Sequence, residues 1–158
     1  MGILIWFYSP LRRRARPHSA AKGSGVPHIV IECSDNMRAR SDLPGLVDCV
    51  HAAALSTGVF PEGGLRTRLA ERRHYRIADG DPANGFVHVV VRMGAGRDAA
   101  TKRRAGEDIF GALCAYLEPV IQTSPLGVSL EVQEIDPELS FKKNNLHEYV
   151  RRRRPAAC

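Results

Sequence analysis

A short apolar segment occurs twice in this chain. Residues 26–32, VPHIVIE, are matched position for position by residues 86–92, FVHVVVR. Runs rich in β-branched residues are typical of buried strands. Each run is followed by a helical pattern and then by a second strand pattern. The sequence therefore predicts two β-α-β repeats, with chance similarity between two short β-branched runs as the alternative.

The first repeat contains a clearly delimited helix. Ser41 or Asp42 is suited to the N-cap, Pro44 to the first turn, and Gly58 to the C-terminal stop. Between these signals the apolar residues recur at helical spacing, which gives the helix one apolar face. The residues of this face are Leu43, Leu46, Val47, Val50 and Ala54.

The second repeat has the same order. Asp98 is suited to cap a helix, and Pro119 is expected to kink this helix or to end it early. Val128, Leu130 and Val132 then alternate with polar residues, as in a strand with one buried face. The predicted apolar face of the second helix consists of Ile109, Phe110, Leu113, Leu117, Val120 and Ile121.

Two further strands and a loop complete the predicted body. Residues 65–70 and 73–78 are candidate strands, and residues 79–85 (DGDPANG) have loop composition. The predicted fold class is α+β: two β-α-β repeats form a four-stranded sheet with both helices on one face. The other face needs cover, so we expect a homotrimer with the sheets facing inward.

The excess positive charge lies at the two ends of the chain. The net charge is +6, but nine of the 23 Lys and Arg residues fall within residues 1–26 and 151–154. Residues 27–150 then hold 14 basic side chains (23 − 9) against 17 acidic ones. This balance argues against a nucleic-acid or membrane-surface binder that uses a basic face of the folded domain.

We expect three segments along the chain. Residues 1–26 show neither a helical nor a strand pattern and are interpreted as a disordered leader or as an extension from a misassigned start. Residues 27–150 form the folded domain, and residues 151–158 form a basic, solvated tail. With no apolar run long enough for a membrane span and no secretion signal, a cytoplasmic location is expected.

The four cysteines do not form a metal-binding or disulfide pattern. Cys33, Cys49, Cys114 and Cys158 are widely spaced and lack a C-x-x-C pair. Reduced thiols are expected, with a disulfide or zinc framework as the less favoured alternative.

Six short motifs resemble those of the 5-carboxymethyl-2-hydroxymuconate isomerase family, which belongs to the tautomerase superfamily. They occur in family order at residues 27–36 (PHIVIECSDN), 58–61 (GVFP), 64–68 (GLRTR), 86–88 (FVH), 94–97 (GAGR) and 144–147 (NNLH). The resemblance implies a tautomerase-like fold, a trimeric or hexameric assembly and an N-terminal proline as the acid/base. It further implies an isomerase of aromatic-acid catabolism, in homoprotocatechuate degradation, that needs no cofactor and no metal.

The implied catalytic residue is Pro27. A proline inside the chain is a tertiary amide whose nitrogen lone pair is delocalised, so this nitrogen cannot accept a proton. At a chain terminus it is a secondary amine, and nearby cations lower the pKa of such a group toward neutrality. Residues 1–26 precede Pro27 in this chain, so we expect the mature protein to start at Pro27. Val26 then stands where an initiator Met belongs.

By the same resemblance, Arg66 and Arg97 are implied as catalytic and substrate-binding residues. A guanidinium group binds a planar carboxylate through two parallel hydrogen bonds, and it stabilises negative charge on an enolate oxygen. The expected partner of the protein is thus a small poly-carboxylate.

Each of these residues also has a plainer interpretation. Pro27 is compatible with the start of an edge strand, and Arg66 and Arg97 with solvated surface charges. His28 and His88 are interpreted as packed strand residues, and the G-x-G of residues 94–96 is only weak evidence for a phosphate-binding turn. The alternative function is therefore a non-catalytic, trimeric binding protein of the same fold that retains its leader.

Overall fold

A computed structural model describes residues 26–153, so the predicted leader, apart from Val26, and the end of the basic tail lie outside the described residues. The elements, in chain order, are β1 (His28–Ser34), a short 3-10 helix η1 (Asp35–Ala39), α1 (Leu43–Ser56), β2 (Arg66–Arg72), β3 (Gly85–Gly94), α2 (Ala99–Ile121), β4 (Leu126–Ile135) and α3 (Leu146–Arg153).

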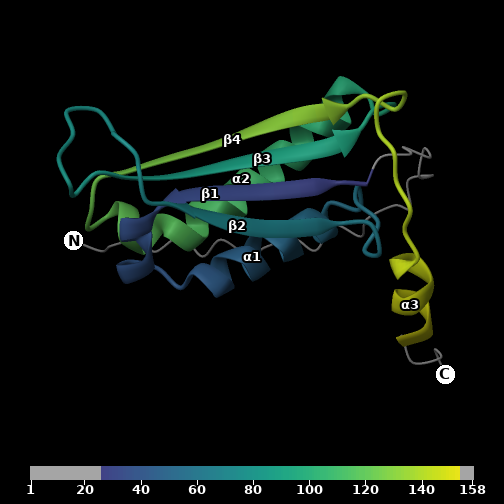
Figure 1. Cartoon of the computed structure of the whole chain (residues 1–158), viewed down its shortest axis with the longest axis horizontal. Helices are drawn as coiled ribbons and strands as arrows, with labels where there is room; N and C mark the ends of the chain where they lie inside the picture. The colour runs from purple at the N-terminus through teal and green to yellow at the C-terminus, as the bar shows by residue number, and fades with distance from the viewer. Residues whose placement is uncertain (1–25, 154–158) are drawn as a thin grey trace, which may run out of the picture.

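The four strands form one mixed sheet in the order β2-β1-β3-β4. Strand β1 is parallel to β2 and β3 is parallel to β4, while β1 and β3 meet in antiparallel orientation at the centre. Helices α1 and α2 lie on the same face of this sheet (Figure 1). The two predicted β-α-β repeats and their arrangement are confirmed. We call the opposite face of the sheet, which neither helix covers, the open face.

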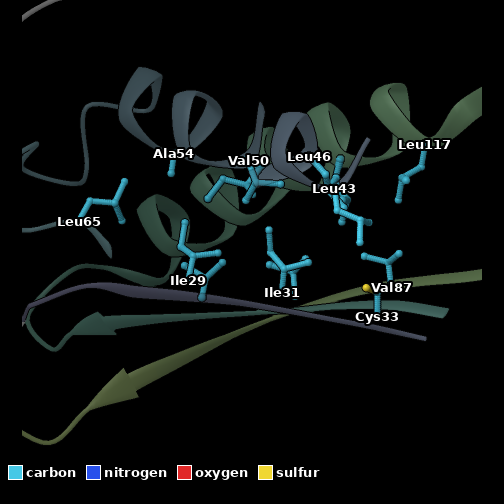
Figure 2. Packing of buried hydrophobic residues seen from close by; sticks show 14 of the residues in the cluster. Ile29, Ile31, Cys33, Leu43, Leu46, Val50, Ala54, Leu65, Val87 and Leu117 are labelled. Carbon is cyan, nitrogen blue, oxygen red and sulfur yellow. The ribbon is translucent and has the colours of Figure 1, made fainter. Parts of the chain in front are cut away.

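Alternate residues of the central strands build the core. Ile29, Ile31 and Cys33 of β1 are fully buried, and Val87, Val89, Val91 and Met93 of β3 are buried beside them. Figure 2 shows Ile29, Ile31, Cys33 and Val87 pointing toward the two helices, which contribute residues such as Leu46, Val50 and Leu117. Because side chains alternate across a strand, the residues between them face the open side.

The predicted N-caps of both helices and the C-terminal stop of the first helix are confirmed. Asp42 and Asp98 are the N-caps of α1 and α2, and Asp98 accepts a hydrogen bond from the Thr101 amide at 2.6 Å. Gly58, with a φ of 69°, follows α1 in the left-handed conformation that glycine tolerates best.

One predicted strand does not exist. Residues 73–78 are irregular, because the register of β1 and β2 ends at the pair Ser34 and Arg72. Beyond Ser34 the chain turns into η1, so residues that follow Arg72 have no strand to pair with. Strand-compatible side chains do not form a strand when no neighbouring strand is present to pair with them.

The second helix also differs from its predicted form. Phe110 and Ile121, predicted to lie on its buried face, are 37% and 38% exposed, because the buried ridge consists of Ile109, Leu113, Leu117 and Val120. Pro119 does not end the helix, which continues to Ile121 and is closed by the Gln122 amide donating to the Glu118 carbonyl at 3.0 Å.

The three cysteines within residues 26–153 are free thiols. Cys33 is buried, and this burial, reinforced by the nearby carboxylates of Glu71 and Asp35, raises the pKa of its thiol to about 11. Cys49 and Cys114 are half-buried rather than buried. None of the helices described has the length and apolar character needed to cross a bilayer.

The C-terminal segment that follows β4 was placed within the folded domain, but no helix or strand was predicted for it. Residues 136–145 run across one end of the sheet and lead into α3, which stands beside that end (Figure 1). The helix crosses residue 150, where the sequence placed the boundary of the folded domain, and carries Arg151, Arg152 and Arg153 as exposed side chains.

Candidate functional site

Pro27 is buried immediately before β1. Its carbonyl oxygen accepts a hydrogen bond from the Arg66 amide at 3.2 Å. The parallel register continues this contact, since the next residue, His28, lies opposite Arg66. The backbone thus holds Pro27 beside Arg66 at one end of the sheet.

Arg66 is the first residue of β2 and follows a tight turn. In this turn the amides of Gly64 and Leu65 both donate to the Pro61 carbonyl, at 2.9 and 3.1 Å. The Nη1 atom of Arg66 donates to the Gly64 carbonyl at 2.9 Å. The half-buried side chain is therefore tied back to the turn, and within residues 26–153 most of its N–H donors have no other hydrogen-bond acceptor and can bind a ligand.

Arg97 reaches the same end of the sheet from the other repeat. It follows β3, and its Nη1 atom donates to the Gly94 carbonyl at 2.9 Å, while Nη2 donates to the Val59 carbonyl at 3.0 Å. The guanidinium group thus bridges the end of β3 and the loop between α1 and β2. Gly96, with a φ of 99°, supplies the positive φ that this turn requires.

The start of β1, the start of β2 and the end of β3 lie together because β1 is parallel to β2 and antiparallel to β3. This topology brings Pro27, Arg66 and Arg97, which are far apart in sequence, to one end of the sheet. Within residues 26–153 neither Arg66 nor Arg97 forms an ion pair with a carboxylate. We call this region the proline end of the sheet.

The NNLH motif fastens the C-terminal segment to the proline end. The Asn144 amide group donates to the Gly63 carbonyl at 3.0 Å. His147 packs so closely on Gly63 that a Cβ atom there would lie 2.7 Å from its Cα atom. The close approach of His147 requires glycine at this position. The C-terminal segment thereby holds the loop before Arg66.

His28 and His88 lie on the open face in equivalent positions of the two repeats. The Nδ1 atom of His28 accepts a hydrogen bond from Nη1 of Arg68 at 3.1 Å, so the imidazole carries its proton on Nε2. Burial, followed by the positive charges of Arg68, Arg66 and Arg92, lowers the pKa of His28. His28 is consequently a neutral group.

His88 has a different environment. Its Nδ1 atom lies 2.8 Å from the Ser129 hydroxyl, and its Nε2 atom lies 3.9 Å from a carboxylate oxygen of Glu131. Polar groups of the neighbouring strand β4 satisfy this side chain. The interpretation of His88 as a packed strand residue agrees with these contacts.

Sequence reasoning missed two cationic residues at the proline end, Arg68 and Arg92. Both lie inside strand patterns, and the small net charge of the body concealed their concentration on one face. The signal that identifies them is the alternation of side chains along a strand, because residues two apart lie on the same face. Within residues 26–153 there is no group of three or more His, Cys, Asp or Glu side chains placed to hold a metal ion.

The comparisons with known proteins give one consistent result. The family model described as 5-carboxymethyl-2-hydroxymuconate isomerase matches residues 27–150. The chain is 37% identical over 122 residues to the 5-carboxymethyl-2-hydroxymuconate Delta-isomerase of Escherichia coli, an alignment that covers 77% of this chain and 97% of the relative.

Solved structures show the same similarity. A crystal structure of a 5-carboxymethyl-2-hydroxymuconate delta-isomerase aligns with a TM-score of 0.75 at 32% identity, over 81% of this chain and 95% of that one. A 5-carboxymethyl-2-hydroxymuconate isomerase from Deinococcus radiodurans R1 aligns with a TM-score of 0.73 at 30% identity, over 79% and 94%. A fused 4-OT trimer, at 15% identity and a TM-score of 0.52 over 77% and 98%, shares the fold alone.

Proposed function

Because the chain belongs to the 5-carboxymethyl-2-hydroxymuconate isomerase family, we propose that it isomerises 5-carboxymethyl-2-hydroxymuconate or a close relative. The protein is an isomerase with a tautomerase-like fold. The proposed pathway is the breakdown of aromatic acids, in homoprotocatechuate degradation. The observation that supports this function most directly is the gathering of Pro27, Arg66 and Arg97 at one end of the sheet.

In the proposed mechanism, the Pro27 nitrogen moves a proton between oxygen and carbon. The amine accepts the proton of the 2-hydroxyl group, the electron pair shifts along the conjugated chain, and the resulting ammonium returns a proton to carbon. Atoms and charge balance without a cofactor. The buried position of Pro27 supports this role, since burial beside cations favours the neutral amine that a general base requires.

Arg66 and Arg97 supply the complementary charge. As the hydroxyl group becomes a carbonyl group, negative charge passes through the oxygen, and a guanidinium group placed there lowers the free energy of the transition state. The other guanidinium group binds a carboxylate. The carbonyl contacts of both side chains, to Gly64, Gly94 and Val59, hold them in place before the substrate arrives.

The mechanism requires Pro27 to be the first residue of the working enzyme. As long as residue 26 is attached, the nitrogen belongs to an amide and has no basic lone pair. We therefore propose that the active form begins at Pro27, with residues 27–150 as its catalytic domain and residues 151–158 as a basic tail.

We further propose a homotrimer located in the cytoplasm. The open face carries the half-buried apolar side chains of Val30, Phe86 and Val90, which further copies of the chain would cover. Sedimentation of the protein tests this assembly.

The proposed function is tested with two forms of the protein, one beginning at Pro27 and one retaining residues 1–26. The first should change the ultraviolet absorbance of a hydroxymuconate substrate, and the second should not. Pro27→Ala in the shorter form should lower kcat by at least about 100-fold, the lower bound for loss of a general base. Pro82→Ala, in the exposed loop before β3, is the matched control and should leave kcat unchanged.

Equal turnover by the two forms would contradict the requirement for a free amine. If the form beginning at Pro27 folds and binds the substrate without turnover, the non-catalytic binding protein is the correct alternative.

A further inference from the structure

Three arginines surround one imidazole on the open face of the proline end. His28 lies opposite Arg66 of β2 and opposite Arg92 of β3. Residues directly opposite each other on neighbouring strands project to the same face. Arg68, two positions after Arg66, shares that face and donates to Nδ1 of His28 at 3.1 Å. The cluster begins one residue after Pro27.

Among the residues that the structure describes, no carboxylate neutralises this cluster. Within residues 26–153, Arg66, Arg68 and Arg92 take part in no ion pair. Arg66 is half-buried and Arg68 and Arg92 are exposed, so water weakens but does not abolish the repulsion between their like charges. The cluster costs stability in the unliganded protein and becomes favourable when an anion binds between its members.

The spacing of the arginines suits an elongated anion. Arg66 and Arg68 are two residues apart on one strand, which places their Cα atoms roughly 7 Å from each other. A six-carbon muconate chain carries carboxylates at both ends, and its carboxymethyl branch carries another. Two subsites along the same strand therefore match two carboxylates of one substrate molecule, one on the main chain and one on the carboxymethyl branch.

We propose that Arg68 and Arg92 form a second carboxylate subsite, which holds the carboxymethyl branch of the substrate, away from the keto-enol group bound by Arg66 and Arg97. His28 is a positioning residue in this subsite, since its Nδ1 atom fixes the Arg68 guanidinium group. The inference rests on the proposed function, because it assumes a poly-carboxylate substrate. It adds a basis for selectivity between substrates with different numbers of carboxylates.

The neutral state of His28 supports this arrangement. Burial and the surrounding arginines lower the pKa of its imidazole, so it accepts the Arg68 hydrogen bond without adding a further positive charge. The Nε2–H group is left as a donor toward the same face.

The test compares two substrates in the form that begins at Pro27. One is 5-carboxymethyl-2-hydroxymuconate, and the other is 2-hydroxymuconate, which lacks the carboxymethyl group. Arg92→Gln and Arg68→Gln should each raise KM for the first substrate by about 10- to 100-fold, the usual loss for a hydrogen-bonded charge. KM for the second substrate should change less than about threefold, because it lacks the carboxymethyl carboxylate that this subsite holds.

Two sets of variants sharpen the result. Arg92→Lys retains the charge and should restore part of the selectivity. His28→Gln retains an acceptor for Arg68 and should resemble the wild type, whereas His28→Phe should shift KM as Arg68→Gln does. Arg72→Gln, on the same strand and face but at the other end, is the matched control and should leave both KM values unchanged.

The proposal is overturned if the variants change KM equally for the two substrates, or if sedimentation shows that they act by dissociating an oligomer. Failure of the wild-type enzyme to isomerise either substrate would instead contradict the proposed function.

Discussion

The same kind of side-chain contact between β1 and β2 occurs at both ends of the open face, but the charge of the β1 residue differs between the two ends. At the proline end, His28 of β1 contacts Arg68, which lies two residues beyond its register partner on β2. At the far end, Glu32 of β1 contacts Arg72, again two residues beyond its register partner. A neutral imidazole occupies one position, and a carboxylate occupies the other.

The difference separates arginines that stabilise the fold from arginines available to a ligand. At the far end Arg72 pairs with Glu32, and Arg38 of η1 forms two hydrogen bonds with Glu71, at 2.7 and 2.9 Å. Both of these positive charges have an internal counterion. At the proline end the counterion is missing from the described residues, and an anionic substrate can take its place.

The largest expected effect distinguishes two arginines on one strand. Arg66→Gln should lower kcat/KM by about 100- to 1,000-fold, the usual loss when a donor to a developing oxyanion is removed. Arg72→Gln should change kcat/KM less than twofold, because its charge is used by Glu32. Steady-state kinetics with the form beginning at Pro27 measures both values. Similar losses in both variants would abolish the distinction between the two ends.

A smaller effect is expected when the proline end is given a counterion. His28→Glu should create the contact that Glu32 makes with Arg72, so that Arg68 is neutralised internally. We expect KM to rise about tenfold, since an internal carboxylate competes with the substrate, while the melting temperature holds or rises. Glu32→His, the reciprocal change, should leave KM unchanged. A His28→Glu enzyme with the KM of the wild type would show that Arg68 does not bind substrate.

The smallest effect concerns the pH dependence of the far end. The hydrogen bond from Arg38 lowers the pKa of Glu71, so Glu71 stabilises the folded state above the pKa of an unfolded glutamate. This contribution is lost as the pH falls through the lower pKa of the folded state. Glu71→Gln should therefore reduce the melting temperature by a few degrees near pH 7 and by nothing in strong acid, with kcat/KM unchanged.

Thermal melts from pH 7 to pH 3 test this prediction. A difference between wild type and variant that persists at the acid end would assign the effect to packing rather than to charge.

Local signals were sufficient to predict most of the fold. Asp98 as N-cap and Gly58 as stop act within one helical turn, so they are readable without the tertiary structure. The repeated β-branched runs likewise predicted the central strands. The strand predicted at residues 73–78 does not form, because a strand needs a partner and the chain beyond β1 turns into η1 instead.

The site was only partly predictable for the same reason. Pro27, Arg66 and Arg97 came from motif resemblance, and the topology then explains why residues so distant in sequence lie together. Arg68 ends the GLRTR motif but was given no role there, and Arg92 belongs to no recognised motif. Their proximity to His28 depends on the register of three strands, which a single sequence does not specify.

The bond between Asn144 and Gly63 joins residues 81 positions apart. Because the ribosome releases the chain from its N-terminus onward, the loop that leads into Arg66 waits for nearly the whole polypeptide before it is fastened. Contacts of such long sequence separation close late and slowly. The sheet can assemble earlier, but the proline end is completed only when synthesis is nearly finished. A truncated translation product would therefore fold its core but lack the contact that holds the loop before Arg66, where catalysis is proposed.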